Sequence, residues 1–400
     1  MDLLQDICQG RTTQVRHADT MHPVDAEPGP SRSTALSSEI AITLSPDGDV
    51  ASRIEALSAT VAFVVENSGP ALRDSIQPLG NKPYDAERQE PLVKRLETTA
   101  DEIQNMVRSV LDGVEQDPDQ LVAVADAYSD ELTRDADHVV AVGEEHGYSY
   151  DVAKRSVRLA TLAMAAGIRM GYDRDKVRDL GACGIVQDWG MYCLADRLRD
   201  PNEPYSVDDW LYFMKHPAYA VDALDQIPGL QDVVRIVAHQ VHEQDDGTGY
   251  PAGLRNERIH PFARIINVVD TYLFLTATYR GRPAYYPYDA MVYLLHQTSR
   301  GRFDQAATRA FVESLTIFPI GSHVQLSDFT EAKVIRQNDG RHTEPIVQRL
   351  SSDAEGRETP IDLTSSELKI IAPLPTPNRK EMRLEKEDLK QIIWQGPDRG

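Results

Sequence analysis

The sequence predicts a mainly α-helical protein that ends in a small β module. From Asp117 to about Leu315, apolar residues recur at helical spacing between short loops, and no alternating strand pattern competes with them. After this stretch the residue pattern changes to short segments rich in β-branched residues, separated by turns that contain Asp, Gly and Asn: FPIGSHVQL, EAKVIRQ and EPIVQRL. We therefore expect an all-helical domain over residues 117–315 and a β module over residues 318–372.

Helical spacing also marks the segment that precedes this domain, over residues 46–115. Apolar residues stand three and four apart at Ile54, Leu57, Val61 and Val64, and the spacing returns between Leu92 and Val110. This predicts one long helical pair. The heptads are too few to choose between a helical bundle and a dimerising stalk, so a signalling partner or a second copy is the expected contact.

Both ends of the chain lack the periodicity of a folded segment. Residues 1–45 are rich in Ser, Thr, Pro, Asp and Gln, which predicts a disordered arm. Residues 373–400 begin with prolines and continue with mixed charge, which predicts a loose charged tail with at most one short helix.

Charge and composition narrow the partners of the 400-residue chain. A formal net charge of −21 opposes binding to polymeric nucleic acid or to an anionic membrane surface. The sequence has no run of eighteen apolar residues and no secretory signal at its start, so we expect a cytoplasmic protein. Cys8, Cys183 and Cys193 form no CxxC pattern, which predicts reduced thiols rather than disulfides or a structural zinc site.

The most informative motif is HQVHEQDDGTGYPAGL at residues 239–254. It resembles the signature of the HD-GYP family, with the residues from Val241 to Pro251 in register. The resemblance continues, in order, through YSYDVAKRSVRLATLAMAAG, GACGIVQDWGM, SVDDWLYFMKHPAYAVDAL and FARIINVVDTYLFLT. It implies an all-helical domain related to metal-dependent phosphohydrolases that cleave cyclic di-GMP.

The resemblance also implies which residues would ligate metal. Of the seven family positions, four keep a side chain able to ligate: Asp188, His216, His242 and Asp270. The other three positions hold Arg155, Gln187 and Val241, and the lysine of the family is replaced by Met191. A guanidinium has no lone pair to give a cation, and valine gives no ligand at all. We therefore expect a degenerate centre. The sequence leaves two alternatives open for Asp188, an ionic contact with Arg155 that replaces a metal and retained metal ligation.

The substrate groove of the family maps onto two further segments. The Gly-Tyr-Pro turn is intact, with Gly249 and Tyr250. Its glycines permit a tight loop that approaches a ligand closely. In the downstream contact segment Tyr279 stands where the family has an arginine, which leaves Arg280 and Arg282 for phosphate recognition. The nearby aromatic cluster is a candidate for base stacking: Tyr285, Tyr286 and Tyr288.

Three functions remain open from these residues. The first is a catalytically impaired module that binds cyclic di-GMP or a protein, with no tightly bound metal. The second is a phosphodiesterase with a reduced Fe, Mn or other divalent metal site, in which Asp188 and His242 are catalytic and Asp151 is an additional ligand. Its metal site would be built from Asp188, His216, His242 and Asp270. His239 lies on the same helical face as His242, which suggests a substitute ligand, but its register corresponds to a non-ligand position of the family. The third is a structural domain without nucleotide, in which the surviving histidines are ordinary hydrogen-bonded residues.

Overall fold

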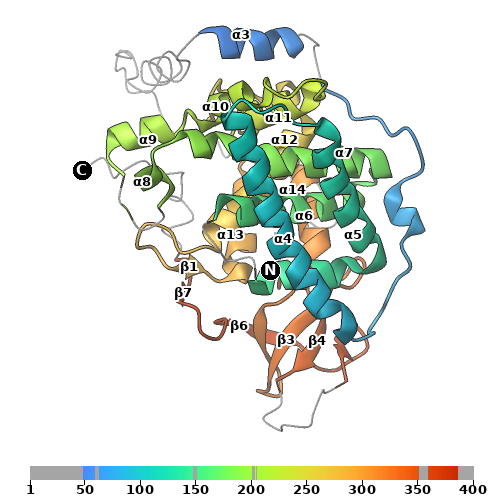
Figure 1. The fold of residues 1–400 in the computed structure, drawn as a ribbon. Helices are drawn as coiled ribbons and strands as arrows, with labels where there is room; N and C mark the ends of the chain where they lie inside the picture. The colour runs from blue at the N-terminus through green and yellow to red at the C-terminus, as the bar shows by residue number, and fades with distance from the viewer. Residues whose placement is uncertain are drawn as a thin grey trace, which may run out of the picture.

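The computed structural model of the chain describes residues 48–58, 63–146, 151–200, 203, 205–350 and 359–385. The arm predicted over residues 1–45 and the end of the predicted tail lie outside the described residues. Within them, the prediction of a mainly α fold followed by a small β module is confirmed (Figure 1).

The helices and the five-stranded sheet follow the predicted order, but one short strand lies within the stretch expected to be all-helical and another lies within the expected loose tail. The α-helices are α3 (Gly48–Leu57), α4 (Ala86–Leu111), α5 (Pro118–His146), α6 (Val152–Met170), α7 (Arg174–Val186), α8 (Asp196–Arg199), α9 (Val207–Phe213), α10 (His216–Leu224), α11 (Asp232–Gln240), α12 (Pro261–Leu275), α13 (Pro287–Ser299) and α14 (Gln305–Leu315). The short 3₁₀ helices are η1 (Leu72–Ser75), η2 (Trp189–Cys193) and η3 (Asn256–Arg258). The strands are β1 (Ala284–Tyr285), β2 (His323–Leu326), β3 (Glu331–Arg336), β4 (Ile346–Arg349), β5 (Ile361–Asp362), β6 (Ile370–Leu374) and β7 (Glu381–Met382).

Helix α6 is the centre of the helical domain. It is buried on nearly all sides and packs against α4, α5, α7, α12 and α14. Its sequence, RLATLAMAAG, carries small and apolar residues around the whole helix, which is the pattern of a fully buried helix. Asp151 caps its N-terminus by accepting a hydrogen bond from the Lys154 amide at 3.0 Å. The first turn of this rigid helix therefore presents Arg155 in a fixed place.

The N-terminal segment joins the same core and does not form one long helical pair. Helix α4 buries its apolar stripe, from Leu92 to Val110, in the core of the helical domain. Helix α3, however, ends at Leu57, and Val64 is 74% exposed in an extended segment, so the helix expected through Val64 is wrong. The carboxylate of Asp173 accepts hydrogen bonds from the amides of Ser68 and Gly69, which gives the backbone partners outside a helix.

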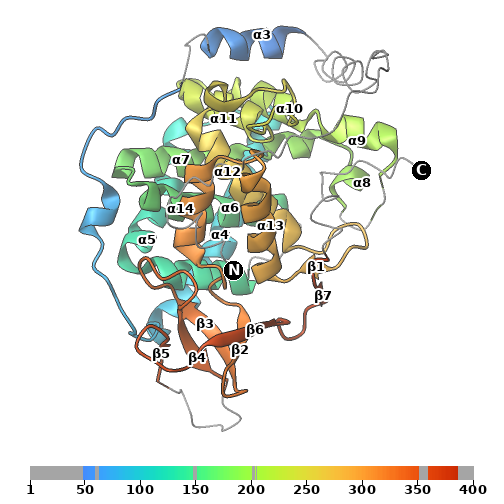
Figure 2. The same cartoon turned by 180° about the vertical axis from the view of Figure 1, so that it is seen from behind.

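The β module is a five-stranded antiparallel sheet with the order β5-β4-β3-β2-β6 and a small core of its own. After the sheet, the chain returns to the helical domain, where β7 pairs in parallel with β1 (Figure 2). Arg379 donates a hydrogen bond to the Thr276 carbonyl at 2.7 Å, and Arg383 forms an ion pair with Asp289 at 2.7 Å. These contacts fasten the end of the described chain beside the loop that follows α12.

A buried arginine joins the sheet to the helical domain. Arg336, at the end of β3, donates to both carboxylate oxygens of Asp135 at 2.7 and 2.8 Å and to the Lys82 carbonyl at 2.6 Å. Its guanidinium also lies over the Tyr84 ring, 4.8 Å from the centroid. Asp135 departs from helical geometry inside α5, with φ −162° and ψ 85°, where the helix kinks beneath the sheet.

No helix in the described part of the chain combines the length and the apolar character that crossing a bilayer requires.

We expect Arg336→Ala to destabilise the protein by about 3–5 kcal/mol, because it leaves the buried Asp135 carboxylate without its counter-charge. Urea unfolding followed by circular dichroism measures this loss. Arg349→Ala is the matched control, since its ion pair with Asp328 is one-third exposed and should contribute less than about 1 kcal/mol. Equal, small losses from both changes would contradict the role given to Arg336.

Candidate functional site

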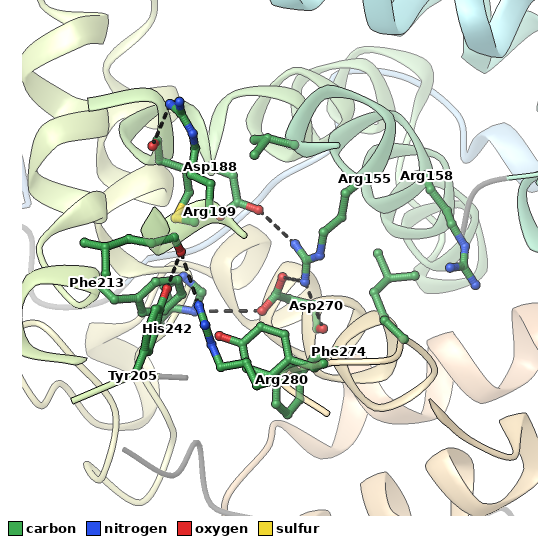
Figure 3. A pocket seen from close by; sticks show the side chains of 16 residues that line it. Arg155, Arg158, Asp188, Arg199, Tyr205, Phe213, His242, Asp270, Phe274 and Arg280 are labelled. Carbon is green, nitrogen blue, oxygen red and sulfur yellow. Dashed lines mark hydrogen bonds and ion pairs between the residues drawn. The ribbon is translucent and has the colours of Figure 1, made fainter. Parts of the chain in front are cut away.

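A cavity of about 90 Å³ opens between the first turn of α6, the end of α12 and the segment from η2 to α9 (Figure 3). Arg155, Asp188, His242 and Asp270 line one part of it. A second group of side chains, rich in arginine and aromatic rings, lines the rest: Arg158, Met191, Arg199, Tyr205, Phe213, Phe274, Tyr279 and Arg280. The structure thus brings about half of the predicted site residues around one cavity.

The backbone places the ligating side chains at the ends of buried helices. Asp188 follows α7, His216 is the first residue of α10, and His242 comes two residues after α11. Gly190 permits the close approach of η2 to α10, because a Cβ at this position would lie 1.9 Å from the His216 carbonyl oxygen. A side chain at Gly190 would therefore separate Asp188 from His216.

Arg155 lies between two buried carboxylates. Its Nη1 is 2.8 Å from Oδ2 of Asp188, and its Nη2 is 2.5 Å from Oδ1 of Asp270. Burial raises the pKa of both carboxyl groups, and the guanidinium opposes this shift. Burial alone would lower the pKa of Arg155, but the two carboxylates outweigh it and leave that pKa raised. The pairing of Arg155 with Asp188, one of the two alternatives, is present, and Asp270 joins it.

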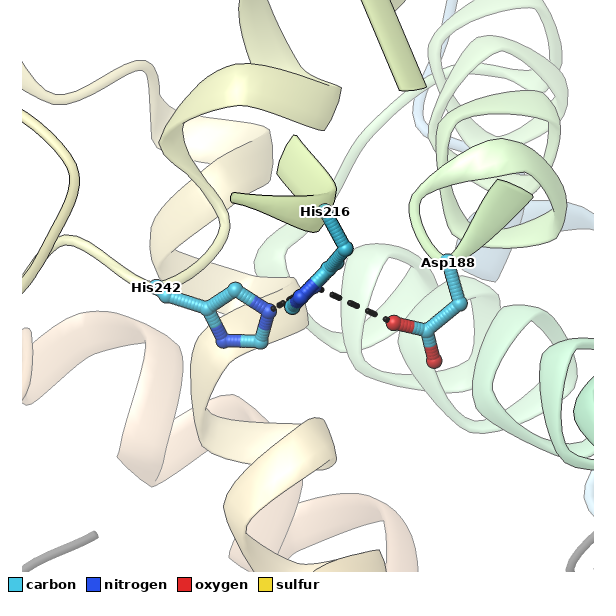
Figure 4. A group of neighbouring side chains, drawn as sticks. All are labelled: Asp188, His216 and His242. Carbon is cyan, nitrogen blue, oxygen red and sulfur yellow. Dashed lines mark hydrogen bonds and ion pairs between the residues drawn. The ribbon is translucent and has the colours of Figure 1, made fainter. Parts of the chain in front are cut away.

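The two histidines contact each other, and His242 also lines the cavity. Figure 4 shows His216 and His242 side by side, with their Nε2 atoms 2.9 Å apart. Burial lowers the pKa of His216 to about 4 and that of His242 well below its usual range, so both rings are neutral at pH 7. Nδ1 of His216 lies 2.8 Å from the Phe213 carbonyl oxygen and must donate to it. Nε2 of His216 is then the acceptor, and Nε2 of His242 carries the proton between the rings.

This geometry bears on which metal could be held. Ligand atoms of Asp188, His216 and His242 lie within 4.8 Å of one another, so these three could hold a single divalent ion. A centre with two metals does not fit, because Arg155 occupies oxygen atoms of Asp188 and Asp270. Gln187 and Val241 are fully buried and supply no imidazole.

The proposed additional ligands lie outside the group of three. The Asp151 carboxylate caps α6 by accepting the Lys154 amide. His239 is buried, and its burial lowers the pKa to about 4, but it is not part of the cluster around Asp188.

The two arginines predicted to bind phosphate have different surroundings in the structure. Arg280 lines the cavity, where its guanidinium lies 3.2 Å from the Tyr205 ring centroid and Nη2 donates to the Leu198 carbonyl at 3.3 Å. Arg282 does not reach the cavity, because its guanidinium donates to carbonyls at and after the end of α12, including Phe274 at 2.8 Å. Arg282 therefore holds the loop that presents Arg280.

The Gly-Tyr-Pro turn supports the site from behind and does not line the cavity. The Tyr250 ring stacks on His242, with centroids 4.8 Å apart and an interplanar angle of 13°. A Cβ on Gly249 would lie 2.4 Å from the His242 carbonyl oxygen and the Gln244 nitrogen. The turn thus packs against His242 and holds its ring in place.

The tyrosine cluster expected to stack on a base also lies outside the cavity. Tyr285 is buried, Tyr288 stacks on Phe318 at 4.9 Å, and Tyr286 lies beneath Arg383. These rings connect the sheet and the returning chain to the helical domain.

Two groups of functional residues were missed by sequence reasoning. Glu243 is buried and accepts hydrogen bonds from the amides of Ala252 at 2.6 Å and Leu254 at 2.8 Å, which closes the Gly-Tyr-Pro turn. Its place next to His242 in the motif was the available signal. Arg199 and Tyr205 line the cavity from a segment with no motif, and only the fold brings them there.

The comparisons with known proteins point to one family. Residues 148–307 match the family model described as an HD domain. A cyclic di-GMP phosphodiesterase of Pseudomonas aeruginosa is 27% identical over 196 residues, 49% of this chain and 45% of that protein. The cyclic di-GMP phosphodiesterase PdeB of Borreliella burgdorferi is 21% identical over 197 residues, 49% of this chain and 51% of that protein.

A third relative acts on a related nucleotide. The 3'3'-cGAMP-specific phosphodiesterase 1 of Vibrio cholerae is 26% identical over 151 residues, 38% of this chain and 35% of that protein. The chain spans about half the length or less of these relatives.

We expect Arg155→Met to destabilise the protein by about 3–5 kcal/mol at pH 7.5, because it leaves two buried carboxylates without a cation. Burial holds their pKa values above those of the unfolded chain, so the folded variant binds more protons and its stability falls as pH rises. Urea unfolding between pH 5 and pH 8 tests this, with Arg155→Lys as the charge-keeping control. A variant with wild-type stability throughout would contradict it.

Arg155→His is expected not to restore a full metal complement, because Gln187 and Val241 still supply no imidazole. Metal analysis of protein purified anaerobically with Fe(II) or Mn(II) measures this. Two metal ions per chain in the single variant would refute our interpretation of the centre.

Proposed function

Because residues 148–307 form an HD domain of the HD-GYP family, we propose that the chain is a signalling protein that binds a cyclic dinucleotide and hydrolyses it weakly or not at all. The observation that carries this proposal is the Arg155 guanidinium between Asp188 and Asp270. It offsets the charge that metal ions would offset, but it has no coordination site for a water molecule.

The consequence for hydrolysis follows from what the reaction needs. Cleaving a phosphodiester at neutral pH requires an activated water and a stabilised leaving oxygen, which a pair of metal ions supplies together. Asp188 and His242 are the residues expected to be catalytic, yet Asp188 is bound to Arg155 and His242 to His216. The side chains around the cavity therefore support binding better than turnover.

The cavity has the chemistry of a nucleotide site. Arg280 and Arg199 bring positive charge to it, and the Tyr205, Phe213 and Phe274 side chains add aromatic rings. Arginine forks suit phosphate oxygens, and aromatic faces suit a stacked base. In a protein with net charge −21, such a local cluster of arginines is what would attract an anionic ligand.

The cavity is small for a cyclic dinucleotide. Its volume of about 90 Å³ is well below the roughly 300–1,000 Å³ typical of small-molecule sites. A cyclic dinucleotide can enter only if lining side chains move apart, and Arg280 and Tyr205 are two that contact each other there. Binding would then exchange the contact of Arg280 with the Tyr205 ring for a contact with phosphate.

A second function, a phosphodiesterase with one metal ion, is favoured by one observation. Asp188, His216 and His242 keep their ligand atoms within 4.8 Å of one another. A single ion there would activate water but would lack the second metal's contact with the leaving oxygen, so we expect slow turnover at most.

The deciding experiment incubates the purified protein anaerobically with cyclic di-GMP or 3'3'-cGAMP, with Fe(II) or Mn(II) supplied. Chromatography measures the linear product, and calorimetry without metal measures binding. We expect saturable binding with micromolar or better affinity and no product. Turnover abolished by His242→Ala would establish the second function instead, and neither binding nor product would leave a structural domain.

Arg280→Ala should weaken nucleotide binding at least about tenfold, as expected for losing a charge-assisted contact with phosphate. The matched control is Arg300→Ala, an exposed arginine at the end of α13 that does not line the cavity. If Arg280→Ala binds as tightly as the wild type, Arg280 is not part of the nucleotide site.

A further inference from the structure

A long groove runs between α4 and α5, away from the cavity of the HD domain. The two helices lie side by side at the front of the molecule in Figure 1. The groove has a volume of about 1,110 Å³ and is lined only by residues of α4 and α5 and of the turn between them. We propose that it is the contact surface of a two-fold homodimer, in which α4 of a second copy lies antiparallel against it.

The sequence of α4 has a second stripe that the core does not use. The core stripe, from Leu92 to Val110, is buried against the helical domain. The second stripe lines the groove at spacings of three and four: Glu87, Pro91, Lys94, Thr98, Glu102, Asn105 and Ser109. Unlike the core stripe, this second stripe is polar, so a neighbour on this side would be held by charge and hydrogen-bond pairing and not by an apolar seam.

The floor of the groove allows a helix to approach closely. It is formed from α5 by small and apolar side chains: Ala123, Val124, Ala127 and Tyr128. Small residues at a helix contact let the ridge of a second helix enter the groove between the first two. The expected assembly is a four-helix arrangement built from α4 and α5 of each copy.

The charges along α4 indicate a second copy of this chain as the occupant. With the two-fold axis at Thr98, each residue faces the one equally far on the other side in the second copy. Lys94 then faces Glu102 of the second copy, and the symmetry makes this pair twice. Both side chains are exposed, and neither forms an ion pair with another described residue.

Among the residues of α4 that line the groove, the rest of this register opposes no like charges. Glu87 faces Ser109, Glu90 faces Met106, and Pro91 faces Asn105. The stripe from Glu87 to Ser109 is about 33 Å long at 1.5 Å per residue, and two helices side by side are about 20 Å wide. Each copy would bury about 650 Å², so the total of about 1,300 Å² reaches the lower range of stable interfaces.

A competing register pairs Lys94 with Glu90. Its axis lies near Leu92, toward the start of α4, and it leaves the groove beside Asn105 and Ser109 unfilled. The register centred on Thr98 covers the whole stripe and is the one we propose.

Sedimentation of the full chain without nucleotide tests the proposal, over micromolar to submillimolar concentrations at physiological ionic strength. We expect a wild-type dimer. Lys94→Glu and Glu102→Lys should each weaken dimerisation at least about tenfold, because each replaces two opposite-charge contacts with two like-charge contacts. The double variant should return to within about threefold of the wild type. Lys369→Glu, an exposed lysine of the β module with the same charge change, should have no effect.

Three outcomes would overturn the proposal. They are a monomeric wild-type chain, a double variant no better than either single one, and rescue of Lys94→Glu by Glu90→Lys instead of Glu102→Lys. Circular dichroism confirms that these surface variants keep the fold. Because no nucleotide is present, failure here leaves the proposed binding function unaffected.

Discussion

The candidate site depends on how two buried carboxylates are neutralised. Asp188 and Asp270 approach each other from different helices, and both adjacent histidines are held neutral by burial. Left alone, this arrangement would place two negative charges in a low-dielectric interior, which is strongly unfavourable. Arg155 places a positive charge between the two carboxylates. The buried helix α6 fixes the position of Arg155, and the two terminal nitrogens of its guanidinium reach Asp188 and Asp270. The chain itself thereby supplies one positive charge to the two carboxylates.

The surrounding backbone holds the side chains on both sides of this cluster in place. Gly190 permits the approach that brings Asp188 near His216, and the Gly-Tyr-Pro turn holds the His242 ring from behind through Tyr250. Glu243 closes that turn by accepting backbone amides. A motif whose spacing resembles a catalytic signature thus performs a scaffolding task that stays useful whether or not the chemistry is retained.

Much of this organisation could be predicted from the sequence. Helical spacing predicted the α domain, and β-branched segments between turns predicted the sheet, because both depend on local patterns of burial. The motif register also offered the contact between Asp188 and Arg155 as one of two alternatives, and the structure contains this contact. The motif register could not predict which of Arg280 and Arg282 lines the cavity. The two residues lie close together in one loop, and the backbone conformation of that loop decides which side chain faces the cavity. Nor could the motif register place Arg199 and Tyr205, because their role comes from tertiary packing alone.

The return of the chain after the sheet has a mechanical consequence. Strand β7 pairs with β1, and Arg379 binds the Thr276 carbonyl, so the segment that leaves β6 is fastened at both sides of the loop that carries Arg280. Only a short segment connects β6 to β7, so the sheet and the strand β7 are joined by a short length of chain. The β module, although distant from Asp188 in sequence, is therefore connected through β7 and Arg379 to the loop that carries Arg280.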